Sequence, residues 1–220
     1  MRTFAEILDL AAARKGAPKV LAAAPVPKTA DELAAIPDRD WLAAMARGIF
    51  QAGISWKVVG TKWPGIEEAF QGFDVGRVSM LDEDAIDALL SDTRVIRSGP
   101  KILAIRDNAA FIREVAAEVA VSAARSATGL PDYAGLIDWL AKKGSRLGGS
   151  TGPYMLRAMG KDSWILSDDV VKRLVEEGVI DGPPTSRKAM AAVQAAFDRW
   201  RAESGQGLTT ISRVLAQSIG

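Results

Sequence analysis

The chain has 220 residues, of which 48% are hydrophobic and 25% charged, a composition typical of a folded protein with a sizeable core and not of a disordered chain. Its formal net charge of +1 means that binding to a polyanion must use a local basic face or backbone N–H groups. Cysteine and histidine are both absent, which excludes disulfides, thiol nucleophiles, Cys/His zinc sites and imidazole acid–base chemistry.

Two further absences bear on location and chemistry. The N-terminal segment contains no secretory signal, because Leu10–Ala13 is followed at once by Arg14 and Lys15. The chain has no run of about 18 apolar residues, so no membrane span is predicted. We therefore expect a cytoplasmic protein that uses no metal and no other cofactor and works with carboxylates, hydroxyls, aromatic rings, Lys or Arg.

Helical periodicity dominates the chain, and the alternating pattern of β-strands is nearly missing, so the predicted fold class is all-α. The first predicted helix covers residues 3–14 and ends before Gly16 and Pro18. Residues 23–28 are expected to form a short extended linker. Capping-box spacing from Thr29 onward then starts another short helix.

The rest of the chain continues this pattern of short helices separated by glycine and proline. Asp38 is the expected cap of an apolar helix over residues 41–52, and Pro64 is expected to open a helix over residues 65–71. The long helix that follows is predicted to stop before Gly129 and Pro131. The remaining predicted helices cover residues 82–90, 101–122, 132–143, a segment ending at Met159, and residues 167–177, 185–203 and 207–219.

A glycine-rich turn between two predicted helices, at residues 144–152, is the most informative motif. Such a turn leaves backbone N–H groups free at the start of the second helix, where the helix dipole is positive, and so predicts a phosphate-binding site. The alternative is a packing corner in which glycine only permits close approach. The residues expected to contact phosphates are Lys143, Arg146, Gly148, Gly149, Ser150, Thr151 and Gly152.

Residues 164–174, which follow the second helix of this motif, read WILSDDVVKRL. The turn and this segment together resemble the helix-hairpin-helix DNA glycosylase superfamily, in which an apolar pair leads into an aspartate at the start of a helix. The resemblance implies one two-lobed helical domain over residues 1–220, with a cleft between the lobes and the hairpin motif at about 132–160. It also implies that Asp168 is the catalytic carboxylate, with Asp169 as the alternative.

A carboxylate at this place suits the cleavage of a glycosidic bond. Loss of a base gives the sugar oxocarbenium character, and a nearby carboxylate stabilises that positive charge or orients the attacking water. The dipole of a helix favours the ionised form of an aspartate in its first turn. The alternative is that Asp168 and Asp169 only cap a helix behind Ser167.

One position in the hairpin bears on mechanism. In the resembled enzymes that also cleave the strand, a lysine nucleophile lies just before the threonine of the second hairpin helix, and here that position is Ser150. Without an amine at this place no Schiff base forms with the sugar, so we expect a monofunctional enzyme.

Residues 50–56, which read FQAGISW, form a second constellation. They resemble the signature of 3-methyladenine DNA glycosylase I, and the resemblance covers roughly residues 41–115. It implies that Trp56 stacks on a flipped base, a role that suits an alkylated, cationic purine. Phe50, Trp63 and Tyr154 are expected to complete the pocket, and Ile54 to fill the vacated base stack. The alternative is that these aromatic residues belong to the core.

The chain also departs from that family. Gly48 stands where the family carries a base-recognising glutamate, and a chain without Cys and His cannot form the family's zinc site. The aspartate at residue 168 instead follows the wider superfamily. Arg94, Arg97, Lys101 and Arg106 recur at intervals of three to five residues and could form a basic stripe that contacts DNA, with a solvated helix face as the alternative.

These resemblances imply a base-excision repair enzyme that hydrolyses the N-glycosidic bond of a damaged base, with 3-methyladenine or another alkylated purine as the expected substrate. The expected partner is double-stranded DNA containing damaged bases. We expect the protein to be a monomer that lies in the cytoplasm, at the nucleoid, and does not bind a membrane. The alternatives are a weak or inactive damaged-DNA-binding protein of the same fold, suggested by Gly48, and a helical scaffold for protein contacts.

Overall fold

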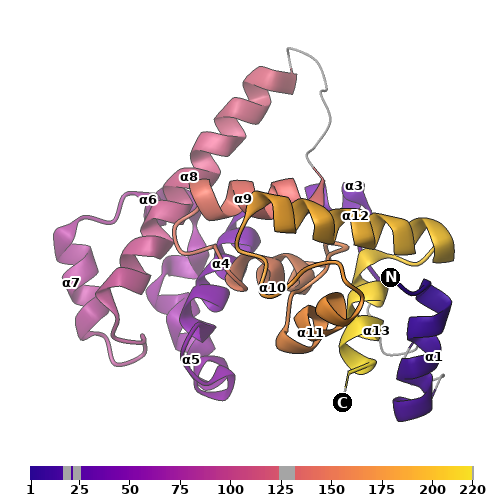
Figure 1. Cartoon of the computed structure of the whole chain (residues 1–220). Coiled ribbons are helices and arrows are strands. Elements are labelled where there is room, and N and C mark those ends of the chain that lie inside the picture. Colours follow the sequence, from indigo (N-terminus) through magenta and orange to yellow (C-terminus); the bar gives the residue numbers. More distant parts are fainter. Residues whose placement is uncertain (17–20, 22–25, 124–131, 220) are drawn as a thin grey trace. The chain divides into compact units, whose positions relative to one another are not determined.

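The structure is a computed structural model of the chain and describes residues 1–16, 21, 26–123 and 132–219 (Figure 1). Every regular element within these ranges is a helix, which confirms the predicted all-α class. Part of the predicted linker, residues 23–25, and the predicted stops at Pro18, Gly129 and Pro131 lie outside the described residues.

The helices form two compact units. Unit 1 comprises Met1–Thr29, Pro131–Gly135 and Gly160–Gly220, and unit 2 comprises Ala30–Leu130 and Leu136–Met159. Helix α9 (Tyr133–Lys143) begins in unit 1 and continues into unit 2. In the part of the chain that is described, no helix combines the length and the apolar character needed to cross a membrane.

Unit 2 is built around helix α4 (Asp38–Gln51), which packs against α5 (Trp56–Ala69), α8 (Gly99–Ala123) and α10 (Thr151–Ala158). The buried residues of α4 recur at the three- and four-residue intervals that give a helix one apolar face. They are Leu42, Met45, Ala46, Ile49 and Phe50. The unit also contains α3 (Ala30–Ala34), the 3₁₀ helix η1 (Gln71–Phe73), α6 (Val75–Ser79) and α7 (Glu83–Ser91).

Two predicted helix starts in unit 2 are wrong. Pro64 lies inside α5 and does not open a helix, although an interior proline costs about 3 kcal/mol. Val59 and Ile66 are both buried on either side of it, and this packing keeps the helix continuous. Asp38 is the first residue of α4, whereas Pro37 holds the capping position without a side-chain hydrogen bond. The Asp38 carboxylate therefore acts only through the helix dipole.

Unit 1 contains α1 (Phe4–Lys15), α11 (Asp168–Glu176), α12 (Arg187–Ser204) and α13 (Leu208–Gln217), and α13 packs against the other three. A chain of aromatic contacts forms its interior, with successive ring centroids 4.8 to 5.8 Å apart. Such pairs add to the burial of apolar area. The rings belong to Tyr133, Trp164, Phe197 and Trp200.

A buried polar network joins the end of α11 to both ends of the chain. The Arg173 side chain is 4% exposed and donates to the Ser218 hydroxyl and carbonyl, both at 2.7 Å. It also pairs with Glu176 at 2.7 Å and with Glu177 at 3.3 Å. Arg2 donates to Glu177 from its backbone N–H and its guanidinium, both at 2.7 Å. Arg173 therefore has a structural role within unit 1.

Candidate nucleic-acid interface

Trp56 and Tyr154 form an exposed aromatic pair in unit 2. Trp56 begins α5 and is 57% exposed, and Tyr154 lies on the hairpin helix α10 and is 39% exposed. Their ring centroids are 5.7 Å apart and their planes are nearly perpendicular, at 88°. The structure thus brings together two of the predicted pocket residues. Exposed aromatic faces of this kind offer a surface on which a nucleobase can stack.

Two backbone hydrogen bonds and a glycine with positive φ shape the loop before Trp56. Ala52 donates its N–H to the Gly48 carbonyl at 3.1 Å, and Ile54 donates to the Gln51 carbonyl at 3.3 Å. Gly53 has φ +77°, the left-handed region that glycine adopts without strain. Ile54, the predicted wedge, is half-buried within this loop.

The hairpin turn connects α9 to α10, as predicted. Gly149 has φ +61°, and the Gly152 N–H donates to the Leu147 carbonyl at 3.1 Å. A Cβ on Gly152 would lie 2.5 Å from that carbonyl oxygen, so this position requires glycine. Within the described residues, the N–H groups of Gly148, Gly149 and Ser150 have no hydrogen-bond acceptor. These three donors are available to an anion.

Asn108 holds the start of the turn, a role that the sequence analysis missed. This residue of α8 is fully buried, donates from Nδ2 to the Ser145 carbonyl and accepts the Ser145 N–H at Oδ1, both at 2.8 Å. A polar residue among the apolar residues of α8 is the signal that could have indicated it, because buried amides are almost always paired.

Lys101, on α8, lies beside both the loop and the hairpin. Its Nζ donates to the carbonyls of Phe50, at 3.1 Å, and Ala52, at 2.5 Å. Burial and the positive charge of Arg146 lower the pKa of Lys101. Arg146 belongs to the hairpin turn and Lys143 is exposed at the end of α9, so this part of unit 2 carries several positive charges.

Two predicted pocket residues are placed differently from the aromatic pair. Phe50 is 0% exposed and packs edge-on against Phe70, so its ring is a core ring with no access to a base. Trp63 is half-buried, stacks on Phe73 with centroids 5.5 Å apart, and has the Arg47 guanidinium 5.1 Å from its ring centre. These contacts give Trp63 a packing role. Phe50 follows the alternative that the aromatic residues form the core, whereas the pocket role of Trp63 stays a prediction.

The arginines of the possible DNA-contacting stripe on α8 and the loop before it have partners within the chain. Arg94 pairs with Asp92 at 2.7 Å and with Glu68 at 3.1 Å. Arg97 donates to the Leu90 carbonyl at 3.2 Å, and Arg106 pairs with its neighbour Asp107 at 3.3 Å. Each of these three arginines therefore has a partner within the described residues, whereas Lys101 donates to backbone carbonyls at the end of α4.

The candidate catalytic aspartates begin α11 in unit 1. Ser167 is the cap and accepts the Val170 N–H at 3.4 Å, so neither aspartate is itself the capping residue. Asp169 pairs with Lys172 at 3.7 Å. Asp168 is exposed, and its carboxylate has no hydrogen-bond or ion-pair partner among the described residues. It therefore remains available at the positive end of a helix dipole.

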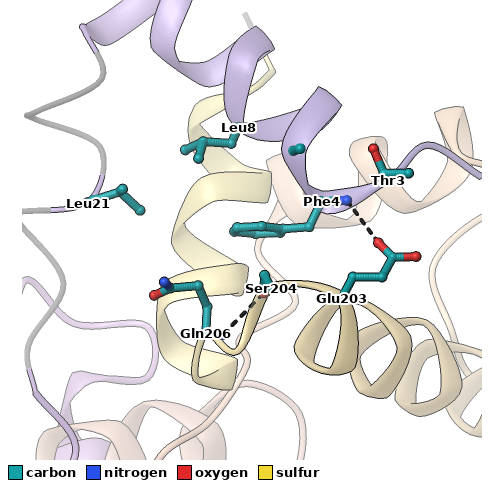
Figure 2. A pocket seen from close by; sticks show the side chains of 8 residues that line it. Thr3, Phe4, Leu8, Leu21, Glu203, Ser204 and Gln206 are labelled. Carbon is teal, nitrogen blue, oxygen red and sulfur yellow. Dashed lines mark hydrogen bonds between the residues drawn. The ribbon is translucent and has the colours of Figure 1, made fainter.

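A hollow in unit 1 contains none of the predicted site residues (Figure 2). Two of its polar groups already have partners. The Glu203 carboxylate accepts the Phe4 N–H at 3.1 Å, and the Ser204 hydroxyl accepts the Gln206 N–H at 3.2 Å. We assign no chemistry to it.

The fold and the hairpin define a helical protein whose unit 2 presents aromatic rings beside free N–H donors and positive charge.

Comparison with known families indicates the type of enzyme. Residues 36–125 match the family model described as methyladenine glycosylase. The match confirms the resemblance predicted from the FQAGISW segment. It supports a DNA glycosylase, an enzyme that binds DNA and repairs alkylated bases. None of the curated proteins matches the chain.

Two solved structures are similar to the chain. One is a Tyr-to-Phe variant of 3-methyladenine DNA glycosylase I in complex with 3-methyladenine, with 20% identity, a TM-score of 0.48, and coverage of 56% of this chain and 77% of that one. The other is 3-methyladenine DNA glycosylase I, with 26% identity, a TM-score of 0.45, and coverage of 61% and 81%.

Gly48, where the resembled family carries a glutamate, lies against the hairpin. A Cβ at this position would be 3.2 Å from Thr151 Cγ2 and 3.7 Å from the Thr151 carbonyl oxygen. Helices α4 and α10 therefore approach closely here, and a Cβ at this position would require the Thr151 side chain to shift by a few tenths of an ångström.

Proposed function

We propose that this protein is a monofunctional DNA glycosylase that flips an alkylated purine out of duplex DNA and hydrolyses its N-glycosidic bond. The observation that carries the proposal is the exposed Trp56–Tyr154 pair beside the hairpin turn, in which Trp56 belongs to the segment that matches the methyladenine glycosylase model. Such an enzyme must take its target base out of the stack and hold it against aromatic side chains.

Stacking on Trp56 supplies the affinity for the flipped base in this proposal. Stacking of a base on an aromatic side chain is worth about 1 to 3 kcal/mol, and a cationic alkylated ring is further attracted to the π face. Tyr154 supports the indole from the side through the perpendicular contact. The alkylated purine, rather than an uncharged lesion, is the substrate that this surface favours. Ile54 fills the space that the flipped base leaves in the duplex.

The hairpin binds the phosphate backbone. The free N–H groups of Gly148, Gly149 and Ser150 donate to the oxygens of a phosphate, and Arg146 and Lys143 add positive charge at the same turn. This arrangement explains how a chain with a net charge of only +1 binds a polyanion. The proposed contacts are to phosphate, so they position the duplex without reading its sequence.

Asp168 is the proposed catalytic carboxylate. Its lack of a partner, in contrast to the ion pair between Asp169 and Lys172, supports this choice of register. The ionised carboxylate stabilises positive charge on the sugar or orients the attacking water. Ser150 supplies no amine for a Schiff base, so the reaction ends with an abasic site and an intact strand.

The test is a set of duplexes, each with one damaged base, scored for release of the free base. Release of an alkylated purine without strand cleavage supports the proposal, and borohydride added to an abasic duplex is expected to trap no protein–DNA adduct. Selective binding to a damaged duplex without release would instead support the alternative, a damaged-DNA-binding protein, which Gly48 favours. Equal, weak binding to all duplexes with no release would contradict both.

A further inference from the structure

Lys101 makes contacts that an ordinary surface lysine does not make. It lies in the first turn of α8, is half-buried, and reaches across to the end of α4, where its Nζ donates to the Phe50 carbonyl at 3.1 Å and the Ala52 carbonyl at 2.5 Å. Within the described residues it forms no ion pair. Its charge is therefore balanced by backbone carbonyls at the negative end of the α4 dipole.

These two carbonyls are among those that a helix end leaves without partners. Of the neighbouring carbonyls, that of Gly48 accepts from Ala52 and that of Gln51 accepts from Ile54 at 3.3 Å, a long bond. Ser55, the residue before α5, forms no side-chain capping bond. The loop from Ala52 to Ser55 thus depends on few bonds, and the two from Lys101 are charge-assisted and correspondingly strong.

We infer that Lys101 is a positioning residue that holds the loop Ala52–Ser55, and through it the Trp56 indole, in the orientation that meets Tyr154. The inference rests on the proposed function in one respect, namely that Trp56 is the surface that receives the flipped base. Lys101 itself does not contact the base in this account. It acts through the backbone that carries Trp56.

The surroundings of Lys101 argue against the simpler role of a phosphate contact. Two of its three N–H donors already have acceptors within the protein. Burial and the positive charge of Arg146 lower the pKa of Lys101, and this crowding by a second cation also disfavours a shared position next to a phosphate-binding turn with no carbonyl partners. Arg146, at the exposed turn, is better placed for a phosphate than a half-buried amine with carbonyl partners.

The test uses the full chain with Lys101→Met, which keeps length and volume but removes the donors, and Lys101→Arg, which keeps the charge. Lys62→Met is the matched control, because Lys62 also donates to a backbone carbonyl, that of Thr93 at 2.6 Å, and not to a carbonyl of the loop Ala52–Ser55. The first readout is amide hydrogen exchange of residues 53–56 in the protein without DNA. The second is the affinity for alkylated and undamaged duplexes at several salt concentrations.

Lys101→Met is expected to speed exchange at residues 53–56 and to reduce the preference for the damaged duplex by about tenfold, the loss typical of one charge-assisted hydrogen bond. The salt dependence of binding is expected to stay unchanged. Lys101→Arg is expected to restore most of the exchange protection, and Lys62→Met to leave both readouts as in the parent protein.

Unchanged exchange at residues 53–56 in Lys101→Met would overturn the inference. So would a fall of about 0.9 in the salt slope, because that fall reports one lost phosphate contact. If the parent protein itself shows no preference for damaged DNA, the proposed function fails, but exchange still decides whether Lys101 holds the loop. If Lys101→Met does not fold, hydrogen exchange at residues 53–56 in Lys101→Arg tests the inference instead. Protection near the level of the parent protein is expected, and a loss of protection would contradict a role for the charge.

Discussion

The rings of Trp56 and Tyr154 meet at 88° with centroids 5.7 Å apart, so the start of α5 and the hairpin helix α10 contribute to one surface of unit 2. The two residues are far apart in the sequence and belong to different motifs. Their contact joins the segment of the proposed base-stacking residue to the turn proposed to bind phosphate. A perpendicular pair of this kind contributes about 0.5 to 1.5 kcal/mol beyond its burial, and it restricts the orientation of the exposed indole.

Replacing Trp56 by alanine is expected to weaken binding to an alkylated duplex by roughly tenfold or more, because one base–aromatic stack is lost. Binding to undamaged duplex, which depends on phosphate contacts, is expected to change much less. Fluorescence anisotropy with both duplexes measures the difference. Trp139→Ala is the control, since Trp139 is also partly exposed but packs on Phe111 of α8. An equal loss on both duplexes would assign Trp56 to structure alone.

Asp168→Asn is expected to lower the rate of base release by at least about a hundredfold, because the neutral amide no longer stabilises positive charge on the sugar. DNA affinity and thermal stability are expected to stay close to those of the parent protein, since the carboxylate is exposed and has no partner among the described residues. Single-turnover kinetics measure the rate. Asp169→Asn is the matched control on the same helix turn, and a larger loss in that variant would move the catalytic assignment by one residue.

Gly152→Ala is expected to destabilise the hairpin by about 1 to 3 kcal/mol, because the added Cβ would lie 2.5 Å from the Leu147 carbonyl oxygen. Affinity for undamaged duplex is expected to fall with it. Gly148→Ala is the control, since its Cβ would meet the Ala141 Cβ at an ordinary 3.5 Å. Thermal unfolding and duplex binding measure both variants. Equal stability of the two variants would show that the turn tolerates a side chain at residue 152.

Glu177 is expected to make the protein sensitive to acid. Burial opposes its ionisation, but the hydrogen bonds and charge of Arg2, with a further bond from Arg173, outweigh this and lower the pKa of Glu177. Because the pKa is lower in the folded than in the unfolded state, the stabilisation is present above the ordinary glutamate pKa and is lost as the pH falls through the folded value. Unfolding free energy measured from pH 7 to pH 3 is expected to show this decline.

Glu177→Gln is expected to lower the free energy of unfolding at pH 7 by about 1 to 3 kcal/mol and to flatten its decline in acid. Glu176→Gln is the control, because Glu176 pairs with the same Arg173 but its side chain is 55% exposed, and exposed pairs contribute about 0 to 1 kcal/mol. An unchanged acid profile in Glu177→Gln would show that other carboxylates control acid unfolding.

Local signals were sufficient to predict most of the helices and both helices of the hairpin. Asp82 and Ser167 are followed by helices and accept N–H groups three residues on, as capping residues do. The same reasoning failed at Pro64. A proline is common in the first turn of a helix, so the local pattern predicted a helix start there, whereas its position inside α5 depends on packing around Val59 and Ile66. The short elements η1 and α6 were not predicted, since each is too short to show a helical period.

The sequence alone determined the chemistry that is possible here and the position of the hairpin, because residue types, helix periods and glycine turns act within a few residues along the chain. Tertiary structure alone decided that Trp56 meets Tyr154, that Phe50 is buried, and that Lys101 donates to the end of α4. The physical reason is that such contacts join distant segments, and only the packing of whole helices sets which side chains face one another.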